Sequence, residues 1–267
     1  MKKYLIITLL SLCFLNSCLE EFPSSDFEFQ EQIFISGLMT SEADYVSVDI
    51  QKTVPVTNET DFSALNNADV SLFTRDALDI VSLVSDSFIV TDGIYTTSEI
   101  ITPIIGNSYW VEIVLEDQTR LISEEETLHP AIPIIDVVKN ENTVQITYAE
   151  PLDEQSLFFI EVNISNNNEI ISESLSLFDN RGVIEASERV FNINEVNTGD
   201  TVKVTIININ FNTYQYYLNV FGNPEDFDTA AFFLPINHNG NIKNAVTNEL
   251  VLGNFVVAGF NTITMEF

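Results

Sequence analysis

Apolar and polar residues alternate along most of the chain after residue 32. Successive side chains of a strand point to opposite faces, so this alternation predicts strands that bury one face and expose the other. The apolar positions of six such segments are Val46, Val48 and Ile50; Ala68, Val70 and Leu72; Tyr109, Val111, Ile113 and Leu115; Val144, Ile146 and Tyr148; Phe158, Ile160, Val162 and Ile164; and Val202, Val204 and Ile206. The pattern predicts an all-β protein.

Residues that tolerate a positive φ stand between the predicted strands. Asn66-Asn67, Asp92-Gly93 and Gly106-Asn107 each favour a hairpin turn. Residues 197–200 favour a turn before a later strand, and the three asparagines at 166–168 favour a loop tip. We therefore expect antiparallel pairing between neighbouring strands.

One segment departs from the strand pattern. Its apolar residues have the spacing of one helical face: Tyr214, Tyr217, Leu218 and Phe221. They predict one short helix near 212–221, in which Asn210 or Asn212 caps the start and Gly222 with Pro224 ends it. An aromatic face of this kind usually packs on the core, so we interpret it as a core contact.

The composition changes near the middle of the chain. An acidic run at 124–126 is followed by two prolines within 129–133, and proline interrupts strand pairing. We predict a linker at 129–133 between an N-terminal domain at 33–128 and a second domain at 134–267. The predicted fold is two tandem antiparallel β-sandwiches, with the short helix in the second.

The first residues have the pattern of a bacterial lipoprotein signal. Two lysines precede an apolar run at 4–15, which is too short to span a bilayer, and Leu-Asn-Ser-Cys follows at 15–18. We predict a signal peptide at 1–17 that is removed, and acyl chains on Cys18 that anchor the protein in membrane lipid. Residues 18–32 form an acidic tether.

Glu20 and Glu21 follow the predicted lipid site closely. They resemble the export signal that sends lipoproteins of the Bacteroidota to the outer face of the outer membrane. We expect a lipid-anchored outer-membrane protein that faces the cell surface, with a periplasm-facing orientation as the alternative.

Acidic residues dominate the charge of the chain. It has 40 Asp and Glu but only 10 Lys and Arg, so the formal net charge is −30. Nucleic-acid binding depends on basic side chains that neutralise phosphates, so this composition excludes a nucleic-acid partner. The two cysteines are Cys13, within the predicted signal, and Cys18, so we expect no disulfide in the mature fold.

The sequence carries none of the common catalytic motifs, such as G-x-S-x-G, H-E-x-x-H, a P-loop or a dinucleotide fingerprint. We interpret its two histidines, His129 and His238, as surface turn residues because of their Pro, Asn and Gly neighbours. We predict that the protein is not an enzyme. The alternative is an extracellular hydrolase that acts on carbohydrate or peptide with two carboxylates, since many acidic pairs are available.

The densest local acidic group is Glu225, Asp226 and Asp228. Calcium prefers six to eight oxygen ligands, so these residues are the candidate calcium ligands. A solvated acidic loop is the interpretation we favour, because EF-hand spacing is absent. We expect no other metal or cofactor.

Two tripeptides, at 200–202 and 228–230, fit the Asp-Thr-small pattern that resembles O-glycosylation sites of exported Bacteroidota proteins. Thr201 also starts a predicted strand, where threonine is common for its β-propensity. Thr229 is therefore the better candidate.

The order of several segments resembles one lipoprotein family over nearly the whole mature chain. These segments are residues 33–40, 52–53, 67–72, 93–95, 106–111, 123–125, 235–237, 240–242 and 252–255. In this order they resemble the Bacteroidota lipoprotein family called domain of unknown function 4249. At Asn254 we expect an aromatic or another large residue before the phenylalanine, so this position departs from the pattern.

The resemblance implies a lipoprotein that works near outer-membrane TonB-dependent receptors and has no agreed activity. The first domain is also similar to the transthyretin-like modules attached to carboxypeptidases and to such receptors, so we expect immunoglobulin-like or transthyretin-like sandwiches. Fold analogy does not convey function.

Taken with the membrane anchor, these features predict a non-enzymatic binding or accessory module. Its partner would be an outer-membrane TonB-dependent receptor or an extracellular ligand, held by the loops or faces of the sandwiches. Besides the hydrolase, a structural adhesin or surface-layer component is a third class.

Overall fold

The computed structural model describes residues 29–55, 63–149, 156–180, 188–221 and 239–267. Contacts group Gln32–Phe267 into one compact unit, separate from Met1–Glu31. The predicted signal peptide, Cys18 and most of the predicted tether lie outside the described residues. No helix in the described ranges is long and apolar enough to cross a membrane.

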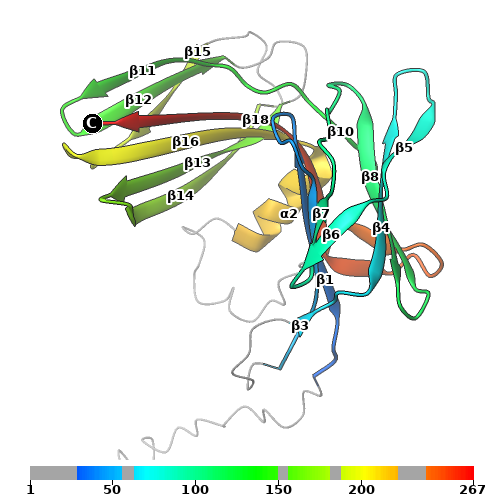
Figure 1. Ribbon diagram of the computed structural model, residues 1–267. Coiled ribbons are helices and arrows are strands. Elements are labelled where there is room, and N and C mark those ends of the chain that lie inside the picture. Colours follow the sequence, from blue (N-terminus) through cyan, green and yellow to red (C-terminus); the bar gives the residue numbers. More distant parts are fainter. Residues whose placement is uncertain (1–28, 56–62, 150–155, 181–187, 222–238) are drawn as a thin grey trace, which may run out of the picture. The chain divides into compact units, whose positions relative to one another are not determined.

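The larger sheet combines strands from both ends of the chain (Figure 1). Its hydrogen-bonded neighbours follow in the order β5 (Val81–Ser85), β4 (Ala68–Arg75), β8 (Ser108–Leu115), β9 (Arg120–Ser123), β17 (Asn239–Asn244), β18 (Leu250–Glu266), β1 (Ile33–Thr40), β2 (Ser47–Lys52), β7 (Ile94–Thr97) and β6 (Phe88–Thr91). Two short strands lie beside this path: β3 (Ser63–Ala64) pairs with β2, and β10 (Glu126–Thr127) pairs with β8. The inward side chains of the larger sheet form one hydrophobic core.

A second group of strands continues from β18. Strand β18 pairs with β16 (Asp200–Ile209), and β16 pairs with β13 (Leu157–Asn166). The other edge of β13 pairs with β14 (Glu169–Asp179). A separate sheet has the order β11 (Ile134–Asn140), β12 (Thr143–Ala149) and β15 (Glu188–Ile193). Ile146 of β12 shares a hydrophobic core with Phe158 and Ile160 of β13, so these two sheets pack against each other.

Strand β18 belongs to both groups. Residues 252–258 pair in parallel with β1, and residues 259–266 pair antiparallel with β16. The change of partner falls at Gly259, where an added Cβ would lie 2.5 Å from the carbonyl oxygens of His129 and Pro130. Only glycine lets the chain segment at 129–130 cross β18 this closely. The red strand in Figure 1 shows this continuity.

The all-β prediction is confirmed, and all six alternating segments form strands whose apolar side chains are largely buried. Two tandem sandwiches are not confirmed, because β17 and residues 252–258 of the predicted second domain complete the sheet of the first. The expectation of wholly antiparallel pairing is wrong at β1 and β18. The linker at 129–133 between two domains stays a prediction.

Of the three predicted hairpin turns, one is confirmed as such. Asp92 and Gly93 have φ values of 50° and 83° and join β6 to β7, which is the geometry of a type I′ turn. Asn66-Asn67 instead links β3 to β4, which pair with different strands, so the hairpin prediction is wrong there. Gly106-Asn107 ends a longer loop before β8, which pairs with β4, β9 and β10 rather than β7.

The predicted helix is α2 (Phe211–Phe221). Tyr214 is buried, and the ring of Tyr217 lies 5.1 Å from that of Phe159 between centroids, so the core contact is confirmed for these residues. Leu218 is 40% exposed, so the prediction is wrong for this side chain. The side chain of Phe221 is outside the described part of the chain.

Candidate functional site

Glu126 of β10 is a buried carboxylate at the meeting point of three elements. Its side chain is 1% exposed, and both of its oxygens accept a hydrogen bond from the Thr213 hydroxyl of α2, at 3.1 and 2.9 Å. Oε1 also accepts from Asn241 Nδ2 of β17 at 3.0 Å, and Oε2 from the Val257 N–H of β18 at 3.4 Å. Burial raises the pKa of Glu126 to about 7, although these hydrogen bonds partly oppose the shift.

Two asparagines close the network around this carboxylate. The side chain of Asn241 donates to the Phe255 carbonyl at 2.7 Å and accepts from the Phe255 N–H at 2.9 Å. Asn254 accepts from the Asn241 N–H at 3.0 Å and donates to the Thr213 hydroxyl at 2.9 Å. Glu126, Thr213, Asn241 and Asn254 are called the Glu126 cluster below.

The departure expected at Asn254 has a physical reason in this cluster. Asn254 is 3% exposed, and its amide supplies one acceptor and one donor to buried partners. A large apolar residue there would leave the Asn241 N–H without this acceptor. The asparagine therefore fits the interior by hydrogen bonding rather than by volume.

His129 is not the surface turn residue that we predicted. It is partly buried, and its Nε2 lies 3.1 Å from Asn210 Oδ1. The amide of Asn210 in turn donates to the carbonyls of Thr127 and Val257, at 2.9 and 3.2 Å. These bonds attach the chain near 127–129 to β18 beside the Glu126 cluster.

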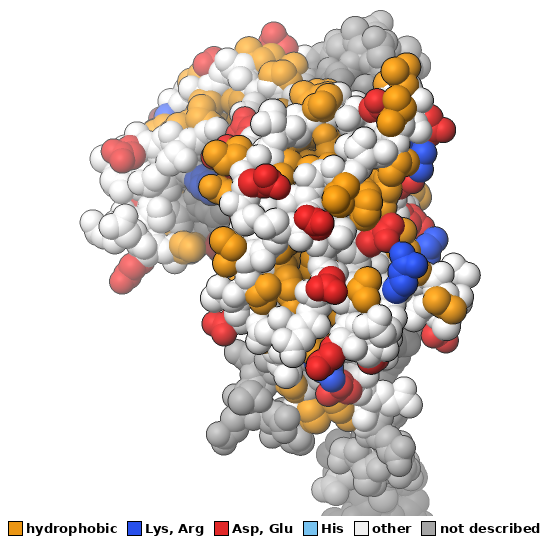
Figure 2. Space-filling model, turned by 45° about the vertical axis from the view of Figure 1, so that its right-hand side comes forward, with side chains coloured by type: hydrophobic (Ala, Val, Ile, Leu, Met, Phe, Trp, Pro, Cys, Tyr) orange, Lys and Arg blue, Asp and Glu red, His pale blue; other side chains and the backbone are white. Residues whose placement is uncertain are grey.

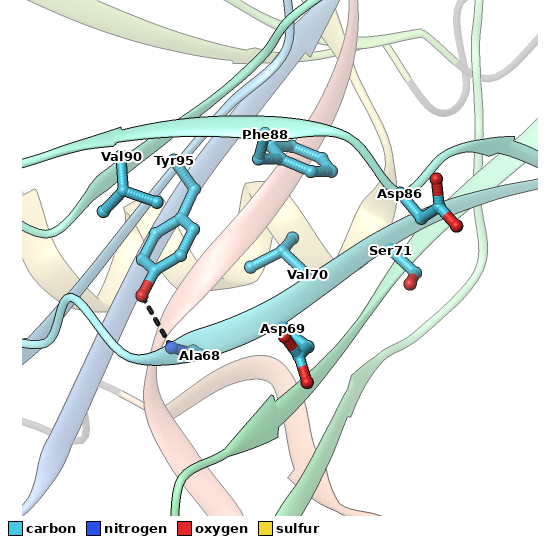
Figure 3. Close-up of a pocket in the computed structure, with 8 residues that line it drawn as sticks. All are labelled: Ala68, Asp69, Val70, Ser71, Asp86, Phe88, Val90 and Tyr95. Carbon is cyan, nitrogen blue, oxygen red and sulfur yellow. Dashed lines mark hydrogen bonds between the residues drawn. The ribbon is translucent and has the colours of Figure 1, made fainter.

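A pocket of about 330 Å³ opens between β4 and β6 (Figure 3). It is lined by Ala68, Asp69, Val70, Ser71, Asp86, Phe88, Val90 and Tyr95. The Tyr95 hydroxyl accepts from the Ala68 N–H and donates to the Leu65 carbonyl, both at 2.9 Å, and burial raises its pKa. Figure 3 shows Asp86 beside Ser71 at one end and Val90 with Tyr95 toward the other.

Exposed apolar side chains gather on two neighbouring loops of the larger sheet. Leu78, in the β4–β5 turn, is 79% exposed, and Ile80 follows it. The β7–β8 loop exposes Ile100, Ile104 and Ile105. The two loops are adjacent, because Asn107 Nδ2 lies 3.5 Å from Thr74 Oγ1. These five residues are called the apolar loop surface.

Acidic residues surround this apolar loop surface. Asp76, Asp79 and Glu99 lie on the same loops, and Asp44 accepts the Ile101 N–H through its carbonyl at 2.8 Å. The guanidinium of Arg75 is engaged by Glu125 and Asp79 at 2.7 Å each. Figure 2, which brings the β4, β5 and β8 side forward, shows hydrophobic and acidic side chains mixed over this face, with few basic ones.

The other predicted site residues are placed as follows. Thr201 is partly buried in β16, paired with both Ser165 and Glu266, and its glycosylation stays a prediction. The remaining residues lie outside the described ranges: Cys18, Glu225, Asp226, Asp228, Thr229 and His238. Within the described ranges, no group of three or more His, Cys, Asp or Glu side chains is arranged to hold a metal ion.

A family model described as Domain of unknown function (DUF4249) matches residues 20–264. The chain belongs to this family. No curated protein matches the sequence. The DUF4249 region includes the Glu126 cluster, the pocket and the apolar loop surface, so all three are features of a DUF4249 domain. The resemblance to this family is confirmed.

The pattern of the sequence does not single out Glu126. In the sequence the acidic run at 124–126 marks only a change of composition before the predicted linker, and of its three residues Glu124 and Glu125 are exposed whereas Glu126 is buried. Glu126 and Leu128 are two positions apart and both are buried, but strand β10 includes only Glu126 and Thr127, which is too short to give a recognisable pattern in the sequence.

Proposed function

We propose that this protein is a lipid-anchored binding or accessory module of the cell envelope that works with an outer-membrane TonB-dependent receptor. The acyl chains on Cys18 would hold it in the outer membrane. In this proposal it has no catalytic role, and the loops of the larger sheet contact the partner.

The apolar loop surface is the observation that supports this proposal. Soluble proteins seldom expose several large apolar residues on adjacent loops, and such patches usually mark a contact with another molecule. A rim of polar or charged residues around an apolar centre is typical of protein interfaces. The acidic rim here fits a partner that offers basic residues around an apolar centre.

The apolar loop surface lies near one end of strand β1. The strand starts at Ile33 and ends at Thr40, beside the turn that contains Asp44 and contacts the β7–β8 loop. A strand of eight residues spans about 26 Å. The apolar loop surface therefore lies at the end of β1 opposite to the point where the chain joins the sheet.

Co-purification from detergent-solubilised outer membrane tests the proposal. A triple variant, Leu78→Ser, Ile104→Ser and Ile105→Ser, should lose the receptor that the wild-type chain retains. A matched control is Ile170→Ser with Ile171→Ser, two exposed isoleucines on β14, which should retain it. A wild-type chain that consistently emerges alone would contradict the proposal.

The hydrolase alternative has one observation in its favour. Two carboxylates, those of Asp69 and Asp86, line the same pocket as the rings of Phe88 and Tyr95. A glycosidase needs two carboxyl groups across a cleft, and aromatic rings often line such clefts. If this alternative is correct, the wild-type chain releases reducing sugars or peptides from cell-surface polymers and Asp69→Asn abolishes the release. Equal product from both chains would reject it.

A further inference from the structure

We propose that the β4–β6 seam, formed by residues 68–71 of β4 and 88–90 of β6, accepts an extended basic segment of another protein as an added strand. The site is separate from the apolar loop surface and rests on different observations: the free edges of two strands, the pocket between them, and its charge.

Among the described strands, none pairs with one edge of the first half of β4. Strand β8 pairs with all of β4 on one side, but β5 pairs only from Leu72 onward on the other. The Ala68 N–H points to this open side, because it donates to the Tyr95 hydroxyl. Backbone groups alternate in direction along a strand, so the N–H and C=O of Val70 also face the open side.

The edge of β6 is free in the same direction. Among the described strands β6 pairs only with β7, and the type I′ turn at Asp92 and Gly93 makes Thr91 and Ile94 a hydrogen-bonded pair. The Ser98 N–H donates to the Ser87 carbonyl at 2.9 Å, so the backbone groups of residues 87, 89 and 91 all face β7. The N–H and C=O groups of Phe88 and Val90 therefore point away from β7.

Both of these free edges border the pocket. Val70, Phe88 and Val90 line it, so the residues with outward backbone groups are also the residues around the cavity (Figure 3). Proteins usually protect a free edge with lysine, proline or a bulge. Here β6 reads Phe-Ile-Val-Thr, and Ile89 is 61% exposed. An unprotected edge of this kind is suited to strand addition.

The negative charge beside the seam favours a basic partner segment. Asp69 and Asp86 are exposed, and both line the pocket together with apolar side chains such as Val70 and Phe88. An extended segment presents alternate side chains to opposite faces, so apolar residues would contact Val70 and Phe88 while basic residues face the two aspartates. A second copy of this chain would bring like charges together, because the net charge is −30.

Hydrogen exchange with synthetic peptides tests this proposal on the full lipidated chain in detergent micelles. The probe is an acetylated, amidated octapeptide that alternates lysine and valine, and it should slow exchange about tenfold at the Val70, Phe88 and Val90 amides. A peptide of equal charge with a central proline should not, because proline removes a backbone donor. Equal protection by both peptides would show charge attraction only and overturn the proposal.

Two variants separate backbone pairing from charge. Val90→Pro removes a donor that faces the seam but keeps the β6–β7 ladder, so the fold should survive while peptide affinity falls at least tenfold. Asp69→Asn with Asp86→Asn should weaken binding about tenfold. The control, Asp136→Asn with Glu141→Gln, removes the same charge near β11 and should bind normally.

The remaining outcomes decide between occupants and between sites. Protection of the seam amides that rises with protein concentration and without peptide would identify a second copy and overturn the proposal. The triple variant of the apolar loop surface should bind the peptide as the wild type does. If it loses the receptor but keeps peptide binding, the two sites are independent, and failure of one leaves the other standing.

Discussion

Polar side chains are usually exposed and aliphatic ones buried, and the Glu126 cluster and the apolar loop surface are the two exceptions to this rule that we compare. The cluster places a carboxylate, a hydroxyl and two amides in the interior, whereas the loop surface places five aliphatic side chains in water. The interior groups hydrogen-bond to one another, so their polar atoms keep partners although they are buried. The surface groups lack such partners within the loops. The cluster therefore serves the fold, and the exposed loops are where we propose a contact.

The largest expected effect comes from removing the buried carboxylate. Glu126→Ala should lower the free energy of unfolding by about 3 kcal/mol, because Thr213 and Asn241 would lose their acceptor in a buried site. Chemical denaturation of the variant and the wild type measures the difference. Glu124→Ala, at an exposed position two residues earlier, is the control and should change stability by less than about 0.5 kcal/mol.

The next effect is a dependence of stability on pH. Because folding raises the pKa of Glu126 from 4.5 to about 7, the folded state binds a proton in this interval that the unfolded state has released. The contribution is fully present below pH 4.5 and is lost as the pH rises through 7, on the order of 3 kcal/mol in total. Unfolding measured from pH 4.5 to pH 8 should show this slope for the wild type. Glu126→Gln should remove it, and an unchanged slope would assign the titration to other groups.

A smaller effect is expected at the position where the family pattern suggests a large residue. Asn254→Leu should cost about 2 kcal/mol, since the Asn241 N–H loses its acceptor and the Thr213 hydroxyl loses a donor. Asn219→Leu, on the exposed side of α2, should be nearly neutral. Thermal unfolding of both variants distinguishes hydrogen bonding from volume. A stable Asn254→Leu chain would show that size matters more than the amide.

The smallest effect on stability is expected at the apolar loop surface. Ile104→Ser with Ile105→Ser should change the free energy of unfolding by less than about 0.5 kcal/mol, because both side chains are already in water. Solubility should improve, since fewer apolar groups are available for association. A loss of more than 1 kcal/mol, measured by denaturation, would mean that these residues support the fold rather than a contact.

The sequence was a good guide wherever neighbours along the chain decide the structure. Tyr109, Val111 and Ile113 alternate with polar residues and are buried in β8, and Asp92-Gly93 forms the turn that its dihedral preferences predict. The helix was found for the same reason. Each of these features depends on a few consecutive residues.

Features that depend on distant partners could not be predicted. Nothing near Leu252 indicates that it pairs in parallel with Phe34, and this pairing is what undoes the division into tandem sandwiches. The free edges of β4 and β6 depend on where β5 ends rather than on any motif. Glu126 resembles its exposed neighbours in type and differs only in what surrounds it.

The shared strand β18 has a consequence for the order of folding. A ribosome produces β1 long before β18, so the larger sheet lacks a central member until β18 has been made. The Phe260 N–H donates to Ser41 Oγ across 219 positions, which shows how late some contacts of the N-terminal strands become available. High sequence separation slows folding. The early strands are therefore expected to remain unfolded until β18 has been made, and the strands that pair with its two halves become native together.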